Sequence, residues 1–175
     1  MNPQRIIAEV AREFIGVHET STNRGPHFEE FWAATTYPTG AVDRQPWCSA
    51  FASFCVHEAD RRSPEIHLRV PPKFPAVAQW LPWAKDDANG CLVFTPEHVG
   101  LGKFKPQAGD IVVFLPHLSH VGIVGEDYQG NGLVATIEGN TNAAGSREGD
   151  GVFAKARSLN FCGSFIRIPV VAAKA

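Results

Sequence analysis

The residue of this chain best suited to covalent chemistry is Cys48, which lies shortly after Pro46. Proline disfavours helical backbone in the residue before it, and Phe51, Phe54 and Cys55 then recur at helical spacing. The pattern predicts that Cys48 lies in the first turn of a buried helix, where unpaired N–H groups and the positive end of the helix dipole favour a thiolate. Such a cysteine acts as a nucleophile if a base reaches it, and is otherwise a small buried hydrophobe.

A histidine and an acidic residue further along the chain could supply that base. His120 opens a predicted strand, 120–124, and Glu138 follows the next predicted strand, 133–137. Turn residues fill the segment between them, which predicts an antiparallel hairpin. A hairpin centred on Gln129 places His120 opposite Glu138, with Cβ atoms about 4.5–5.5 Å apart. If the centre slips by one or two residues, Asn140 competes with Glu138 for this role. Either side chain would orient the imidazole so that its other nitrogen serves as the base.

Small residues lie next to both members of this predicted pair. Gly122 is on the same strand face as His120, because side chains alternate along a strand, and Gly139 directly follows Glu138. We expect both glycines to leave space through which a substrate backbone approaches the site.

No metal centre or disulfide framework is predicted. His117 and His120 could form half of a metal site, but no carboxylate or cysteine stands nearby at ligand spacing, so we expect neither metal nor cofactor. The cysteines contain no C-x-x-C pair, and a single bridge among the last three stays open. The four cysteines are Cys48, Cys55, Cys91 and Cys162.

The composition describes a globular protein. With 175 residues, 44% of them hydrophobic, we expect a single domain over residues 1–175 that acts as a monomer. The formal net charge of −2 argues against nucleic acid as a partner. The N-terminus lacks the apolar run of a secretory signal peptide, and no apolar stretch approaches the roughly 20 residues that span a bilayer. We therefore expect synthesis in the cytoplasm without membrane insertion.

The order of the predicted elements indicates the fold class. Apolar periodicity predicts helices over 4–15, 27–34 and from Cys48 to about Arg62, then a proline-rich segment over 64–108 with a helical piece at 76–83. Strands are predicted over 111–115, 120–124, 133–137 and 163–169. Helices followed by strands indicate an α+β fold with an antiparallel sheet.

Four segments together resemble the CHAP and NlpC-type cysteine peptidases, which are papain-like cell-wall amidases and endopeptidases. The resemblance extends over roughly residues 5–168, and the cysteine and histidine segments stand in the family's order and spacing. It implies a papain-like arrangement in which N-terminal helices pack on an antiparallel β-sheet. The segments are 47–51, 109–114, 120–124 and 137–140.

The resemblance also implies a role for each matching residue. Cys48 matches the nucleophile, His120 the general base and Glu138 the orienting residue, with Asn140 as an assistant. The backbone N–H of Cys48 and the side chain of Gln45 are the candidate oxyanion donors. Many relatives carry an acidic or small residue where this chain has Trp47. Trp47, with Gln45 and Asn140, is counted among the candidate oxyanion or substrate contacts.

The implied reaction is hydrolysis of an amide bond in peptidoglycan, either in the stem peptide or between N-acetylmuramic acid and L-alanine. Delivery to the periplasm or cell wall would use a phage holin or a secretion system such as type VI. In the second case we expect a cognate immunity or inhibitor protein as a partner. The alternatives are a papain-like peptidase or acyltransferase acting on a protein, and an inactive wall-binding domain.

Overall fold

A computed structural model describes residues 3–37, 46–63, 66–115, 119–144 and 149–172. These residues form an α+β fold built on a six-stranded antiparallel sheet of order β2–β7–β3–β4–β5–β6, with β1 and β8 paired separately. The α+β class and the antiparallel sheet are thus confirmed. The strands are β1 Ile66–Leu68, β2 Leu92–Phe94, β3 Ile111–Phe114, β4 His120–Val124, β5 Leu133–Thr141, β6 Gly151–Ser158, β7 Cys162–Arg167 and β8 Val170–Ala172.

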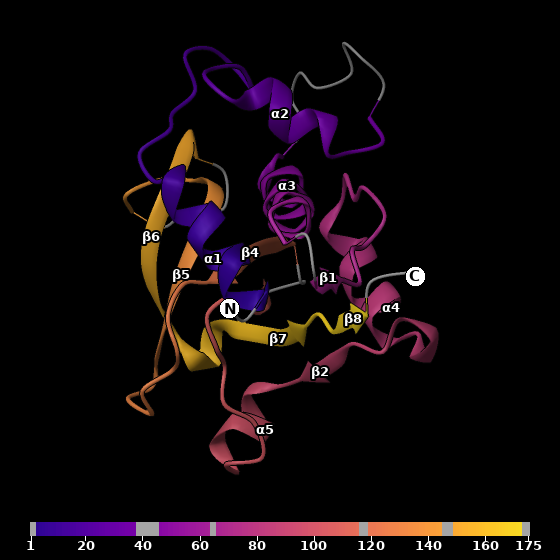
Figure 1. Cartoon of the computed structure of the whole chain (residues 1–175). Helices are drawn as coiled ribbons and strands as arrows, with labels where there is room; N and C mark the ends of the chain where they lie inside the picture. Colours follow the sequence, from indigo (N-terminus) through magenta and orange to yellow (C-terminus); the bar gives the residue numbers. More distant parts are fainter. Residues whose placement is uncertain (1–2, 38–45, 64–65, 116–118, 145–148, 173–175) are drawn as a thin grey trace.

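Three N-terminal helices lie on one side of the sheet, and α3 lies between α2 and the sheet (Figure 1). They are α1 Pro3–Glu13, α2 Phe28–Ala33 and α3 Cys48–Arg61. Ile7 and Val10 of α1 and Phe51 and Val56 of α3 are fully or almost fully buried in the larger of two apolar clusters. The apolar periodicity of α1 and α3 therefore marks the face that each of these two helices packs against the sheet.

The short helix α5, Pro96–Gly100, lies beneath the sheet, away from the three N-terminal helices (Figure 1). Val99 and Phe104 from this region join Val112 and Phe165 in a second apolar cluster. Alternate residues of β3 belong to the two clusters, and all four of its residues are buried. The central strands are consequently covered on both faces, which holds the strand end at His120 in a fixed place.

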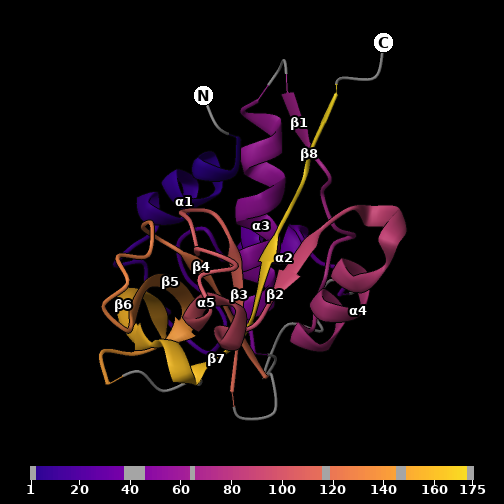
Figure 2. The same ribbon diagram turned by 90° about the horizontal axis from the view of Figure 1, so that it is seen from below.

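The first half of the proline-rich segment, residues 66–85, packs beside α3 and helps to fix the start of that helix (Figure 2). It contains a 3-10 turn at Val77–Gln79 and α4, Trp80–Lys85, near the predicted helical piece. Ser49 Oγ donates to the carbonyl of Phe74 at 2.9 Å, and Trp80 Nε1 donates to Ser49 Oγ at 2.9 Å. Trp80 is fully buried, so it anchors the segment beside α3.

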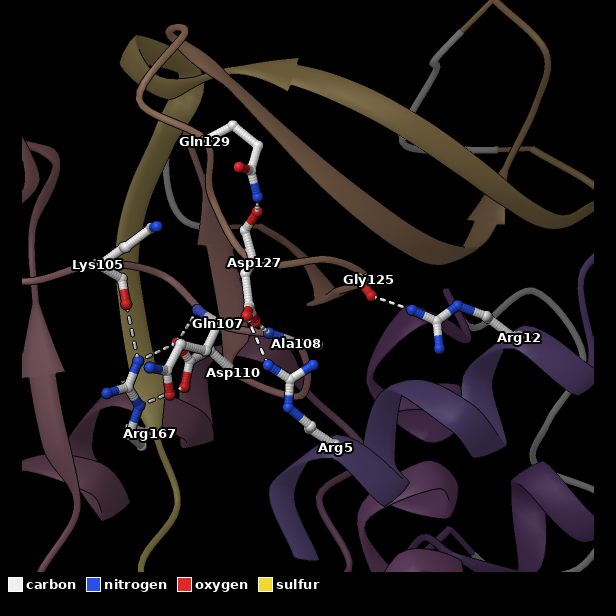
Figure 3. A network of polar contacts seen from close by, with 10 residues as sticks. All are labelled: Arg5, Arg12, Lys105, Gln107, Ala108, Asp110, Gly125, Asp127, Gln129 and Arg167. Carbon is white, nitrogen blue, oxygen red and sulfur yellow. Dashed lines mark hydrogen bonds and ion pairs between the residues drawn. The ribbon is translucent and has the colours of Figure 1, made fainter. Parts of the chain in front are cut away.

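A polar network joins α1, the loop after β4 and the start of β3 (Figure 3). Arg5 bonds the carboxylate of Asp127 at 2.5 Å, and that carboxylate also accepts from the backbone N–H of Ala108 at 3.0 Å. Arg167 of β7 donates two hydrogen bonds, each of 2.8 Å, to the buried carboxylate of Asp110. The network lies at the end of β3 and β4 that is opposite to the pair Phe114 and His120.

Several elements differ from the sequence-based expectation. Strand β6 is not among the strands that the sequence predicts, and β5 continues through Glu138 to Thr141 instead of ending at Ile137. The alternation of Lys155 and Arg157 with alanines is typical of a charged edge strand and gives only a weak apolar signal. Among the described residues, no helix is both long and apolar enough to cross a membrane.

Candidate active site

Cys48 is the first residue of α3, as predicted. The first i→i−4 bond of the helix runs from the N–H of Phe51 to the carbonyl of Trp47, at 2.9 Å. The N–H groups of Cys48, Ser49 and Ala50 precede that bond and have no partner within the helix. The cysteine is almost fully buried, so its side chain lies against the protein's own groups at the positive end of the helix.

The structure gives the side chain of Trp47 a packing role. Its indole is fully buried, donates from Nε1 to Glu19 Oε1 at 2.7 Å, and meets the ring of Phe28 edge to face with centroids 4.7 Å apart. A Cβ on Gly139 would lie 2.7 Å from Trp47 Cζ3. Gly139 therefore makes room for the helix α3 to pack on β5, and the expectation that it admits a substrate is wrong.

His120 and Glu138 are hydrogen bonded to each other, with His120 Nε2 3.0 Å from Glu138 Oε2. Both side chains are buried, with exposed fractions of 5% and 0%. The predicted centre of the hairpin is wrong by one residue, because Ile123 pairs with Ile137 and Val124 with Thr136. Continued along the strands, this register places Glu138 opposite Gly122 and not opposite His120.

Gly122 explains how Glu138 still reaches the histidine. Directly opposed residues are nearest neighbours, but diagonal neighbours across a sheet remain within reach of a long side chain. A Cβ on Gly122 would lie 2.7 Å from Glu138 Cγ and 3.2 Å from Phe114 Cε2. The space beside Gly122 is thus filled by Glu138 itself, and the expectation that this glycine admits a substrate is also wrong.

Asn140 lies at an irregularity of β5. Its φ is 57°, in the left-handed region, and the pairing of β5 with β6 shifts between Glu138 and Thr141. The residue is buried, and its carbonyl accepts from the N–H of Gly149 at 3.1 Å. Of the two side chains left open by the sequence, Glu138 is the one bonded to His120. Gln45 and His117 lie outside the described residues.

Glu138 has more partners than the sequence suggested. Thr136 Oγ1 donates to Oε1 at 2.6 Å, and Arg157 donates from Nε to Oε1 at 2.8 Å and from its terminal nitrogen to Oε2 at 2.5 Å. Burial alone would raise the pKa of this carboxyl. The hydrogen bonds and charges of Arg157 and His120, with the bond from Thr136, outweigh burial and lower the pKa to about 2.

The second ring nitrogen of His120 is the one available for chemistry. Nδ1 is buried, and it has no hydrogen-bond partner among the described residues. Burial opposes a positive charge on the ring, but interaction with the Cys48 thiol and with Glu138 prevails and raises the pKa of His120 to about 9. With Nε2 occupied by Glu138, Nδ1 is the nitrogen through which the ring meets the thiol, and catalytic hydrogen bonds are often long before a substrate binds.

The other three cysteines differ from Cys48 in the surroundings of their thiols. All four thiols are free. Burial raises the pKa of Cys55 well above its usual value, that of Cys91 to about 11 and that of Cys162 to about 12. Cys48 is the cysteine whose thiol interacts with a histidine that is itself held by a carboxylate.

Metal ligands do not gather in the described part of the chain. No group of three or more His, Cys, Asp or Glu side chains there could hold a metal ion. What the arrangement can do is proton transfer: a thiol, an imidazole and a buried carboxylate follow one another in the order that nucleophilic catalysis by cysteine requires.

A comparison with protein families agrees with this geometry. The model of the CHAP domain matches residues 40–140 of the chain. The chain belongs to the CHAP-domain family. The matched residues hold all three members of the candidate site, whereas α1, β6 and β7 lie outside the match. The search of curated proteins gave no match. Membership of the CHAP family supports a hydrolase or amidase function on peptidoglycan in general terms, as the sequence resemblance implied.

Proposed function

We propose that this CHAP domain hydrolyses an amide bond of peptidoglycan through Cys48, His120 and Glu138. The observation that carries the proposal is the bond between His120 Nε2 and Glu138 Oε2, because it leaves Nδ1 for the thiol at the start of α3. The thiol then attacks the substrate, the imidazole moves protons, and the carboxylate fixes the tautomer and supports the imidazolium.

The reaction proceeds in two halves. Cys48 Sγ, whose proton has already passed to His120 Nδ1, attacks the scissile carbonyl carbon as a thiolate, and the oxyanion accepts a hydrogen bond from the backbone N–H of Cys48. The imidazolium then protonates the amine as the C–N bond breaks, which leaves a thioester. In the second half His120 Nδ1 takes a proton from water, the hydroxide attacks the thioester, and a carboxylic acid and the free thiol are released.

The scissile bond is either a stem-peptide bond or the link between N-acetylmuramic acid and L-alanine. Delivery would follow one of two routes, release through a holin as an endolysin or transfer by a secretion system as an antibacterial effector. The effector route would require an immunity protein that blocks the site in the producing cell. We propose that the protein acts as a monomer in the periplasm or cell wall.

Mass spectrometry of muropeptides tests this function. Purified Gram-negative sacculi are incubated with wild type, with Cys48→Ala and with Cys91→Ala as a matched cysteine control. New fragments should appear with wild type and Cys91→Ala only, and their masses identify the bond. If folded wild-type protein releases nothing while it cleaves casein, the substrate is a protein and the wall function is wrong.

A further inference from the structure

We propose that Arg157 of β6 is a positioning residue of this site, which holds the Glu138 carboxylate in the orientation that His120 requires. Arg157 lies beyond the residues matched by the CHAP family model. The inference rests on the triad of the proposed function, but not on which bond that triad cleaves.

The first argument is the geometry of the carboxylate. Arg157 binds both oxygens of Glu138, Oε1 at 2.8 Å and Oε2 at 2.5 Å, and Oε2 is also the oxygen bonded to His120. A planar guanidinium bound to both oxygens fixes the carboxylate plane as well as its position. Thr136 bonds Oε1 only, so it cannot set the direction of the oxygen that faces the histidine.

The second argument is that Arg157 is itself held in place. Its guanidinium carbon lies 5.6 Å from the ring centre of Phe114 and 5.6 Å from that of Phe161. Phe114 in turn stacks on the His120 ring, with centroids 5.6 Å apart and planes 27° apart. The arginine and the histidine therefore meet the same aromatic ring while they bind the same carboxylate, which couples their positions.

The third argument concerns charge. Glu138 is fully buried, and an ionised carboxylate in such a place needs compensating charge. Among the described residues, the titratable groups that interact with it are His120, Arg157, Lys155 and the protonated thiol of Cys162. Arg157 keeps its charge at all relevant pH values, so it compensates Glu138 even when His120 gives up its proton during the reaction.

The chain offers a matched control in Arg167. It also donates from Nε and a terminal nitrogen to a fully buried carboxylate, that of Asp110 (Figure 3). Its guanidinium carbon lies 4.6 Å from the ring centre of Phe104. That pair is at the far end of β3 from His120. Loss of either arginine should reduce stability, but only loss of Arg157 should change the chemistry.

The test compares Arg157→Met, Arg157→Lys and Arg167→Met. Three quantities are measured on folded protein: kcat and KM for muropeptide release, the midpoint of the Glu138 carboxyl titration by 13C NMR, and the rate of Cys48 alkylation by iodoacetamide. For Arg157→Met we expect kcat to fall about 10- to 100-fold with little change in KM, since small displacements of a catalytic group have effects of this size. Its Glu138 midpoint should rise, because a positive partner is removed.

Arg157→Lys keeps the charge but loses the planar two-point contact. It should leave the Glu138 midpoint near that of wild type and still lower kcat about 10-fold. Arg167→Met should melt earlier but match wild type in kcat, Cys48 alkylation and the Glu138 midpoint. If Arg157→Met does not fold, the kcat of Arg157→Lys alone tests whether Arg157 positions Glu138.

A wild-type kcat in the folded Arg157 variants, or an equal loss in Arg167→Met, would overturn the inference. The alkylation and NMR measurements need no wall substrate. If wild type releases no muropeptide, the wall function fails. Slower alkylation of Cys48 in folded Arg157→Lys than in wild type, at an unchanged Glu138 midpoint, would still support the positioning role, and equal alkylation rates would overturn it.

Discussion

Glu138 lies across the sheet from Gly122, yet it bonds the ring of His120 at 3.0 Å. The missing side chain at Gly122 is what allows this diagonal contact, because a Cβ there would lie 2.7 Å from Glu138 Cγ. The catalytic arrangement that we propose therefore depends on a residue without a side chain as much as on the residues that carry the chemistry.

Gly122→Ala should separate the acid from the histidine. The new methyl group must displace Glu138 or Phe114, so we expect kcat for muropeptide release to fall about 100-fold and the free energy of unfolding to fall by about 1–3 kcal/mol. Gly125→Ala is the control, since its Cβ would meet Ile137 only at 3.4 Å, an ordinary contact. Kinetics and denaturant unfolding of both variants check this; equal activity in the two would contradict it.

Alkylation should distinguish activation from exposure. Cys91 is the only one of the four cysteines with a partly exposed side chain, but burial raises its pKa to about 11. Near neutral pH iodoacetamide should therefore modify Cys48 first, because the thiolate is the reactive form. Peptide mass spectrometry at short times measures the order. Faster labelling of Cys91 would mean that exposure governs reactivity and that His120 does not activate Cys48.

The pair His120 and Glu138 should stabilise the fold over a defined pH range. The pKa of Glu138 falls from 4.5 to about 2, so its contribution is complete above 4.5 and is lost as the pH falls toward 2. The pKa of His120 rises from 6.5 to about 9, so its contribution is complete below 6.5 and is lost as the pH rises through 9. The difference in unfolding free energy between wild type and Glu138→Gln should be largest between pH 4.5 and 6.5. A difference that is constant with pH would refute the claim that an ionised Glu138 paired with a protonated His120 stabilises the fold.

Trp47→Phe tests whether this residue packs or binds substrate. The variant loses the bond from Nε1 to Glu19, and we expect the free energy of unfolding to fall by about 0.5–1.5 kcal/mol. KM for muropeptide release should not change, because the indole is fully buried. A marked rise in KM at unchanged stability would instead support the substrate contact that the sequence suggested.

Much of the fold could be predicted from sequence because local patterns decide it. The apolar periodicity after Cys48 sets α3, and the apolar runs at Ile111 and His120 set β3 and β4. The hairpin register was harder, since Gly130 and Gly132 both adopt positive φ and the turn has more than one possible centre.

The site was predicted only in part, because some of its contacts form only when segments far apart in the sequence pair with each other. Cys48, His120 and Glu138 each carry a local signal of element and residue type. Arg157 carries none, because its role arises only when β6 pairs with β5 and brings the guanidinium to Glu138. The alternation of basic residues with alanines in β6 could have indicated an edge strand, but not which carboxylate it serves.

The central claim is that Cys48 forms a covalent intermediate, and acid-quenched intact-protein mass spectrometry tests it most directly. Wild type mixed with sacculi or purified muropeptides should show a transient mass increase equal to the acyl half of the cleaved substrate. Peptide mapping should place it on Cys48, and Cys48→Ala should show neither adduct nor products. Continued product release by Cys48→Ala would contradict the account.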